Sequence, residues 1–319
     1  MNRRENALEV INNTGRAEYL PVIGKDILSK AAFPVFDRPR NSKNGYDWFG
    51  CYWLFDRNTG GFVQDPKIPP RITDITEWKN QLSLPSLETT EWEEAAKEDL
   101  SGFDRNEQAL IIMTESGIFE RLHHLIGFQN ALLSMYEEPE AFKGLINALL
   151  EWRIGVFEKI VKYYRPDAVL VMDDVGGQTG PLMSLDMYRE MIKPYDERLI
   201  AEIHRTGTKA IYHSCGKIET FIGDFIDMGA DIINPLQGGI NDLAAIEAEH
   251  GERAVFYGGL SGRMNYTSTT EAELRTEVDD LMDIFWEKKN LIIPVRAYVP
   301  GNGAIIADEA EKYNMRHRG

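Results

Sequence analysis

The feature of this sequence that most limits its fold is a series of seven short apolar runs, most of them followed by a helical stretch. Most of these runs begin with four apolar residues that do not alternate with polar ones, which is typical of parallel strands buried on both faces. The expected strands are residues 19–24, 109–115, 168–174, 209–215, 231–237, 254–260 and 291–299.

The stretches between the runs carry signals that start helices. Thr90 with Glu93 and Thr270 with Glu273 have the spacing of a capping box, and Pro139 stands where a first-turn proline is favoured. We expect helices at residues 91–99, 139–164, 184–206, 218–228, 240–250 and 271–289.

The alternation of strands and helices predicts an α/β fold, a (β/α)8 TIM-type barrel in a single domain over residues 1–319. An eighth strand is expected at Phe33–Asp37 or Phe49–Leu54. An open doubly wound sheet is the alternative, because the N-terminal third is hard to divide into elements. Residues 38–90, rich in Pro, Gly, Asn and Trp, are expected to form an N-terminal excursion over the barrel mouth.

The charge balance and the cysteine count exclude several classes of protein. With 35 Lys and Arg against 51 Asp and Glu, the formal charge is −16, which argues against a nucleic-acid partner. The only cysteines, Cys51 and Cys215, are too few for a disulfide scaffold and suit a reducing compartment. The first residues lack the apolar core of a secretory signal, and no apolar run is long enough to cross a membrane. We therefore expect a cytoplasmic protein.

Polar side chains follow five successive predicted strands. Active sites of such barrels lie at the C-terminal ends of the strands, and a purely structural protein has no reason to place polar groups there five times. These residues are Asp173, Asp174 and Gln178, then His213 and Cys215, then Asn234 and Gln237, then Tyr257, and finally Arg296, Tyr298 and Asn302. The pattern predicts an enzyme-type site at one rim.

His213 and Cys215 form the sharpest motif. Residues i and i+2 of a strand point to the same face, so imidazole and thiolate can converge on one ion, and these ligand types suit Zn²⁺. Two ligands alone do not make a metal site, however. A hydrogen-bonded histidine beside a buried, unreactive cysteine is the simpler interpretation, and a Cys–His nucleophile pair is a third.

The Asp173–Asp174 pair follows the strand expected at 168–174. Because adjacent strand residues face opposite ways, only one carboxylate should enter the barrel mouth, while the other caps a loop or orients a neighbour. The inward carboxylate can serve as base, metal ligand or anchor for a cation. Two solvated loop acids are the alternative interpretation.

Other candidates are less specific. His123 and His124 lie in an apolar helical stretch and are expected to be packing or surface residues. Cys51 is expected to be buried, although a chain fold that brings it to the rim would make it a distant metal ligand.

Several of these segments together resemble the uroporphyrinogen decarboxylase superfamily, in particular its branch of corrinoid-dependent methyltransferases. The resemblance is strongest over residues 110–260 and implies a (β/α)8 barrel, in agreement with the strand count. The segments that carry it are Asp173-Asp-Val-Gly-Gly-Gln178, Tyr212-His-Ser-Cys-Gly216, Met228-Gly-Ala-Asp-Ile-Ile-Asn-Pro-Leu-Gln237 and Gly117-Ile-Phe-Glu-Arg-Leu-His-His-Leu-Ile-Gly127.

The motifs separate the two activities of this superfamily. The decarboxylases hold their substrate with an early Arg-Gln-Ala-Gly-Arg-type loop, where this chain offers only Phe36-Asp-Arg38-Pro-Arg40. The methyltransferase branch uses His-x-Cys to bind zinc, and a separate corrinoid protein carries the methyl group. Its thiol-activating members have a third ligand, a cysteine after the last strand. This chain has Arg296-Ala-Tyr-Val-Pro-Gly-Asn302 there, so Cys51, Asp173 or Asp174 would have to replace that cysteine.

The resulting hypothesis is a methyltransferase that moves a methyl group from a small O-, S- or N-methyl compound to a corrinoid protein, or from that protein to an acceptor. A uroporphyrinogen (tetrapyrrole) decarboxylase is the alternative, and a non-catalytic binder of corrinoid or tetrapyrrole is a third option. The metal ligands are expected to be His213, Cys215 and Asp174, with Asp173, Asp174 and His213 in catalytic roles. Substrate contacts are expected from Gln178, Asn234, Gln237, Arg296 and Arg38.

Overall fold

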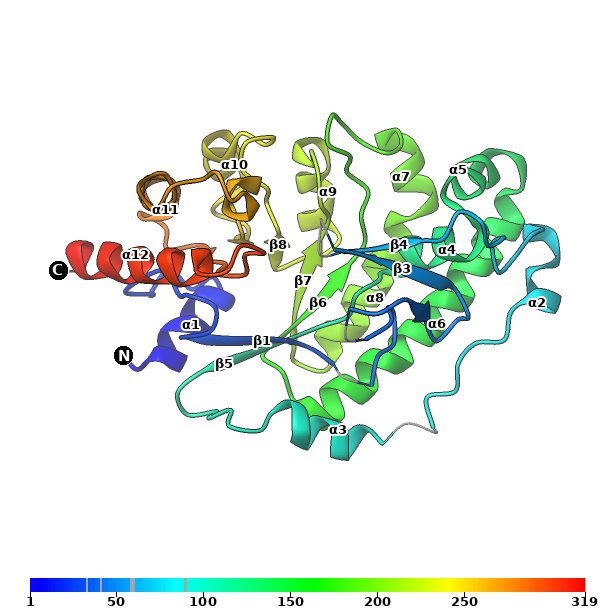
Figure 1. Cartoon of the computed structure of the whole chain (residues 1–319), viewed down its shortest axis with the longest axis horizontal. Helices are drawn as coiled ribbons and strands as arrows, with labels where there is room; N and C mark the ends of the chain where they lie inside the picture. The colour runs from blue at the N-terminus through cyan, green and yellow to red at the C-terminus, as the bar shows by residue number, and fades with distance from the viewer. Residues whose placement is uncertain (33, 41, 58–60, 89–90, 319) are drawn as a thin grey trace.

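The computed structural model describes residues 1–32, 34–40, 42–57, 61–88 and 91–318. A parallel sheet lies at the centre of the molecule, helices surround it, and a small antiparallel sheet lies to one side (Figure 1). The strands are β1 (Ile27–Ala31), β2 (Gly45–Tyr46), β3 (Tyr52–Asp56), β4 (Gly61–Gln64), β5 (Ala109–Met113), β6 (Ala168–Met172), β7 (Lys209–His213), β8 (Ile232–Asn234), β9 (Val255–Tyr257) and β10 (Leu291–Ile292).

Most helices follow a strand of the central sheet in the chain. They are α1 (Arg3–Ile11), α2 (Trp78–Gln81), α3 (Trp92–Asp99), α4 (Ile118–Ile126), α5 (Phe128–Glu137), α6 (Pro139–Tyr164), α7 (Leu185–Met191), α8 (Lys193–Arg205), α9 (Ile222–Asp227), α10 (Leu243–His250), α11 (Glu271–Phe285) and α12 (Asn302–His317), with 3-10 turns η1 (Ile75–Glu77), η2 (Glu219–Phe221) and η3 (Gly262–Asn265). Within the described residues, no helix is both long and apolar enough to cross a membrane.

The predicted helix signals are confirmed where the structure describes them. Thr270 and Glu273 form the expected capping box at the start of α11, and Pro139 opens α6. Thr90, the other predicted cap, lies outside the described residues.

The central sheet has the order β1-β5-β6-β7-β8-β9-β10, all parallel. This order follows the chain without the reversal of a doubly wound sheet, so the α/β prediction is confirmed and the doubly wound alternative is wrong.

The sheet curls, so that its first and last strands approach each other. Side chains from all seven strands, including Ile27 of β1 and Ile292 of β10, meet in one apolar cluster, which α1 closes at one end with Val10 and Ile11. The two edges are also linked by backbone hydrogen bonds, since Ile23 donates to Ile293 and Ile293 donates to Pro21. A flat sheet permits neither arrangement.

The predicted first and eighth strands differ from the structure. Residues 19–24 provide only two isolated bridges, from Val22 to Ile293 and from Ile23 to Ile27, and the first regular strand is β1 at Ile27–Ala31. Of the two candidates for the eighth strand, Pro34–Asp37 form no strand, and Phe33 lies outside the described residues. Residues 52–54 belong to β3, which pairs antiparallel with β2 and β4. Both candidates for the eighth strand are therefore wrong.

The small sheet is joined to α4, which follows β5 directly in the chain. The Gln64 amide and the Cys51 thiol both donate to the backbone carbonyl of His124. That residues 38–90 cover the barrel mouth stays a prediction.

A fully buried ion network fixes the N-terminal segment against two helices. Asp37 pairs with Arg121 of α4 and Arg153 of α6, and Arg121 also pairs with Asp47. Burial alone would raise the pKa of Asp37, but the charges of Arg153 and Arg121 outweigh it and hold that pKa below its usual value.

Replacement of Asp37 by Asn should destabilise the protein by about 3–5 kcal/mol, because the buried Arg153 loses its carboxylate partner and the buried Arg121 keeps only Asp47. Urea unfolding measures this change. Since the folded-state pKa of Asp37 is depressed, the difference between wild type and Asp37→Asn should shrink as the pH falls below about 4. Glu93→Gln, which breaks an exposed pair with Lys97, is the control and should cost at most about 0.5 kcal/mol. Equal effects of the two substitutions would contradict the prediction.

Candidate functional site

The alternation of side chains along β6 and β7 sorts the predicted site residues. Leu170 and Ile211 belong to the apolar cluster inside the curled sheet, and Met172 packs against that cluster. Asp174 comes two residues after Met172, and His213 comes two residues after Ile211. Both side chains therefore point to the inward side of the sheet. Asp173 follows the outward side, where α4 lies.

Asp173 holds the first turn of α4. Its carboxylate is fully buried and accepts hydrogen bonds from the backbone N–H groups of Ile118, Phe119 and Glu120 at 2.7–2.9 Å. Burial and the charge of Asp196 raise the pKa of Asp173, and the three amides oppose that shift. The sequence analysis expected one aspartate of the pair to face the mouth and the other to cap a loop or orient a neighbour. In the structure Asp173 caps α4.

Asp174, His213 and Cys215 come together at the C-terminal ends of β6 and β7. Their ligand atoms all lie within 4.8 Å of one another. The His213 Nε2 atom is 3.3 Å from the Cys215 Sγ and 3.7 Å from an oxygen of Asp174. The same Asp174 oxygen accepts the backbone N–H of Cys215 at 2.7 Å, which fixes the carboxylate beside the thiol.

Neighbouring strands determine the orientation of the His213 ring. His213 and Asn234 are register partners on β7 and β8. The Asn234 Nδ2 donates to the carbonyl of Tyr257 at 2.8 Å, so the Asn234 Oδ1 is the atom that faces the His213 Nδ1, at 2.5 Å. The proton therefore lies on Nδ1, and the Nε2 lone pair points toward Cys215 and Asp174.

The charges around Cys215 disfavour a free thiolate. Burial, followed by the charges of Asp174 and Glu120, raises the pKa of the Cys215 thiol well above its usual value. A nucleophilic cysteine needs the opposite, an electropositive surrounding that lowers its pKa. The group therefore lacks the electrostatics of a Cys–His nucleophile, whereas a cation would be attracted to it.

Of the predicted substrate residues, Asn234 and Gln237 contact the group of Asp174, His213 and Cys215 or the backbone directly beside it, whereas Gln178 has no such contact in the described part of the chain. The Gln237 carboxamide accepts the backbone N–H of Gly216, directly after Cys215, and Asn234 contacts His213. Gln178 is exposed, and no hydrogen bond or ion pair among the described residues joins it to the group.

Arg38 lies beside the buried Glu120, and both Arg38 and Arg296 lie near the exposed Glu115. The Arg38 guanidinium donates to Ser116 at 2.7 Å, lies 3.8 Å from a Glu120 oxygen and stacks on the Trp53 ring. Partial desolvation of its carboxylate raises the pKa of Glu115, although the residue as a whole is exposed, and the charges of Arg38 and Arg296 oppose this shift. Both arginines therefore already face carboxylates of the protein.

Cys51 does not belong to the group around His213. Its thiol donates to the His124 carbonyl at 3.3 Å, and burial raises its pKa to about 12. Of the two cysteines, Cys215 is the one beside His213.

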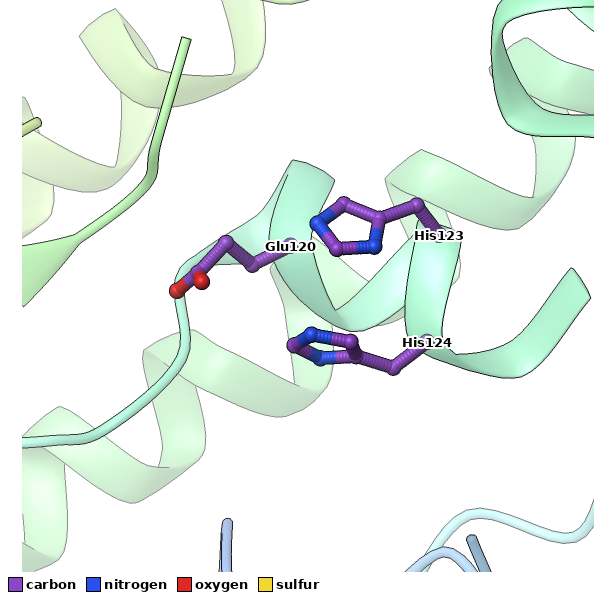
Figure 2. Close-up of side chains that lie close together, drawn as sticks. All are labelled: Glu120, His123 and His124. Atoms are coloured by element: carbon purple, nitrogen blue, oxygen red, sulfur yellow. The ribbon is translucent and has the colours of Figure 1, made fainter. Parts of the chain in front are cut away.

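The sequence analysis missed a second cluster, formed by Glu120, His123 and His124 on α4. Their ligand atoms also lie within 4.8 Å of one another, and Figure 2 shows the three side chains extending from the helix in the same general direction. Glu120 and His124 are buried rather than exposed. The i, i+3, i+4 spacing would have indicated a shared helix face, but not that this face is turned toward the protein interior.

The model of the family described as Uroporphyrinogen decarboxylase (URO-D) matches residues 65–297. A methyltransferase from Methanosarcina mazei has a similar structure, with a TM-score of 0.71 and 12% identity over 98% of this chain and 99% of that one. β-Methylaspartase from Clostridium tetanomorphum matches with a TM-score of 0.44 and 12% identity, over 96% of this chain and 62% of that one. No curated protein sequence matches this chain significantly.

Replacement of Asp173 by Ala should cost about 3 kcal/mol or more, because three buried N–H groups of α4 lose their acceptor. The free energy of unfolding from urea titration measures this loss. Ser184→Ala, which removes one side-chain cap from α7, is the matched control and should cost about 1 kcal/mol. A loss no larger than that of Ser184→Ala would show that Asp173 does not hold α4.

Proposed function

The chain belongs to the uroporphyrinogen decarboxylase family, and from this premise we propose that it is a methyltransferase. It moves a methyl group from a small O-, S- or N-methyl compound to a corrinoid protein, or from that protein to an acceptor. The observation that carries the proposal is the convergence of Asp174, His213 and Cys215 at the ends of β6 and β7. In this proposal the curled sheet is a (β/α)8 barrel whose C-terminal end receives the substrate.

The three side chains fit a catalytic zinc ion. They offer one nitrogen, one sulfur and one oxygen, and three protein ligands with a fourth open position are typical of catalytic zinc. Ligand atoms around a tetrahedral zinc lie roughly 3.4–3.7 Å apart for bonds of about 2.0–2.3 Å. The 3.3 Å and 3.7 Å separations of His213 Nε2 from its two neighbours are close to this range. Bound there, zinc would supply Lewis-acid activation of the heteroatom that carries or accepts the methyl group.

The other residues of the site position these three ligands and the substrate. Asn234 keeps the His213 ring oriented, with its own amide fixed by the Tyr257 carbonyl. The Gln237 carboxamide holds the backbone after Cys215. Because the carboxylate of Asp173 is occupied by α4, we assign it a positioning role and reserve proton transfer or metal binding for Asp174.

Arg296 and Arg38 are the candidates for an anionic group of the substrate. Each already faces Glu115, and Arg38 also faces Glu120, so little positive charge is left at the rim for several carboxylates. This balance disfavours uroporphyrinogen, a polycarboxylate, as substrate. Decarboxylation nevertheless remains the second candidate activity, because the matching family model is described by it.

Loss of either His213 or Cys215 should remove about one equivalent of zinc from the purified protein, because two ligands alone hold zinc weakly. The variants His213→Ala and Cys215→Ser test this by elemental analysis after dialysis. His204→Ala, on the exposed end of α8, is the control and should keep the wild-type metal content. Equal metal content in all four proteins would overturn the zinc assignment.

Methyl transfer is tested with free cob(I)alamin and a panel of methoxy, methylthio and methylamine compounds. We expect the absorption spectrum of methylcobalamin to appear with at least one compound. His213→Ala should slow its appearance by roughly 100-fold or more, because Lewis-acid activation is worth several kcal/mol.

Two other outcomes would replace this proposal. Release of CO₂ and coproporphyrinogen from uroporphyrinogen would establish the decarboxylase. Tight binding of cobalamin or porphyrin, with no turnover of any compound, would establish a non-catalytic binder.

A further inference from the structure

The cluster on α4 has the spacing of a helical metal site. At about 100° per residue, His123 and His124 lie about 60° and 40° to either side of Glu120, one turn further along the helix. Glu-x-x-His at i and i+3 is also the motif with which helical bundles bind pairs of metal ions. The sequence of α4 thus directs two imidazoles and one carboxylate to one side of the helix.

The structure brings the three groups together inside the protein. Their ligand atoms lie within 4.8 Å of one another, and in Figure 2 the two rings lie one above the other, with the Glu120 side chain extending beyond them. Glu120 is 8% exposed and His124 is 7% exposed, so both are more than nine-tenths buried.

Two atoms of this cluster have no hydrogen-bond partner within the described part of the chain. They are one carboxylate oxygen of Glu120 and the Nδ1 atom of His124. The other Glu120 oxygen has Arg38 at 3.8 Å, which is too far for a hydrogen bond. Buried polar atoms are nearly always paired, so these two unpartnered atoms point to a ligand of the cluster.

Burial acts on all three groups of the cluster. With the charge of Arg38 it lowers the pKa of His123 to about 3 and that of His124 well below its usual value, and with the charge of Asp174 it raises the pKa of Glu120 well above its usual value. All three groups therefore favour their neutral forms, and Glu120 would release a proton when a metal ion binds.

His124 also lines a cavity of about 220 Å³ between α4 and the small sheet. Cys51, Gln64 and Arg71 line the same cavity.

We propose that Glu120, His123 and His124 form a second site for a divalent transition-metal ion, separate from the group of Asp174, His213 and Cys215. Two imidazoles and one carboxylate favour Zn²⁺ or Fe²⁺ and leave coordination positions open for water or an anionic group of a substrate. The site does not depend on the proposed methyl transfer, nor on metal at His213.

The experiment starts from the full chain with the first site removed, so that α4 is unchanged. After chelation and dialysis against Zn²⁺, the wild type should hold about two equivalents and the double variant His213→Ala/Cys215→Ser about one, because each set of three ligands binds one ion. Addition of His124→Gln or of Glu120→Gln to the double variant should remove this last equivalent. His204→Ala is the control and should remove none.

Cobalt separates the two sites even if one variant folds poorly. Co²⁺ bound at Cys215 gives thiolate-to-metal charge-transfer absorption, whereas Co²⁺ bound only by Glu120, His123 and His124 gives d–d bands without it. The double variant should therefore retain the d–d bands alone. If the double variant folds, as circular dichroism would show, and binds neither Zn²⁺ nor Co²⁺, the second site does not exist and the two histidines only pack against Trp53 and Phe119.

Discussion

The buried carboxylate of Asp173 is the constraint on which both metal-type clusters depend. It accepts three amides of α4 and so ties the end of β6 to the start of that helix. The contact is close, because a Cβ atom on Gly117 would lie 2.2 Å from the carbonyl oxygen of Met172. With Asp173 directed outward, Asp174 is directed inward toward His213, and α4 is fixed with Glu120 near both.

The distribution of charge explains why this rim suits a cation. The charge of Asp174 contributes to the raised pKa of Glu120, and both acids contribute to that of Cys215, so three potentially anionic groups, of which Glu120 is buried, act on one another. Asp37, by contrast, is neutralised by Arg121 and Arg153 in its own network. The negative charge at the ends of β6 and β7 is therefore less fully compensated than that of Asp37, since Arg38 lies 3.8 Å from Glu120 rather than within hydrogen-bond distance.

The alternation rule for strands predicted that His213 and Cys215 share a face and that only one carboxylate of the Asp173–Asp174 pair faces the barrel mouth, but it did not decide which one. The same rule did not predict the first and eighth strands correctly. Val22 pairs with Ile293, directly after β10, only through tertiary hydrogen bonds that local composition does not encode. Helical periodicity did not identify the cluster of His123 and His124 either, because an apolar helix with two histidines has the same pattern whether they face a ligand or a packed core. Only the packing of α4 against the N-terminal segment shows that they are enclosed.

The carboxylate beside His213 and Cys215 illustrates how the scaffold places the third group of the proposed metal site. Cys51, the other thiol, is held by the His124 carbonyl and is not part of the group. Asp174 instead follows β6, which is hydrogen-bonded along its length to β7, and its oxygen also accepts the backbone N–H of Cys215. All three groups are thus placed by two adjacent strands, whose separation is set by the sheet rather than by a loop. A site built on such rigid elements needs little rearrangement to bind an ion, and a ligand from the distant Cys51 segment would lack this advantage.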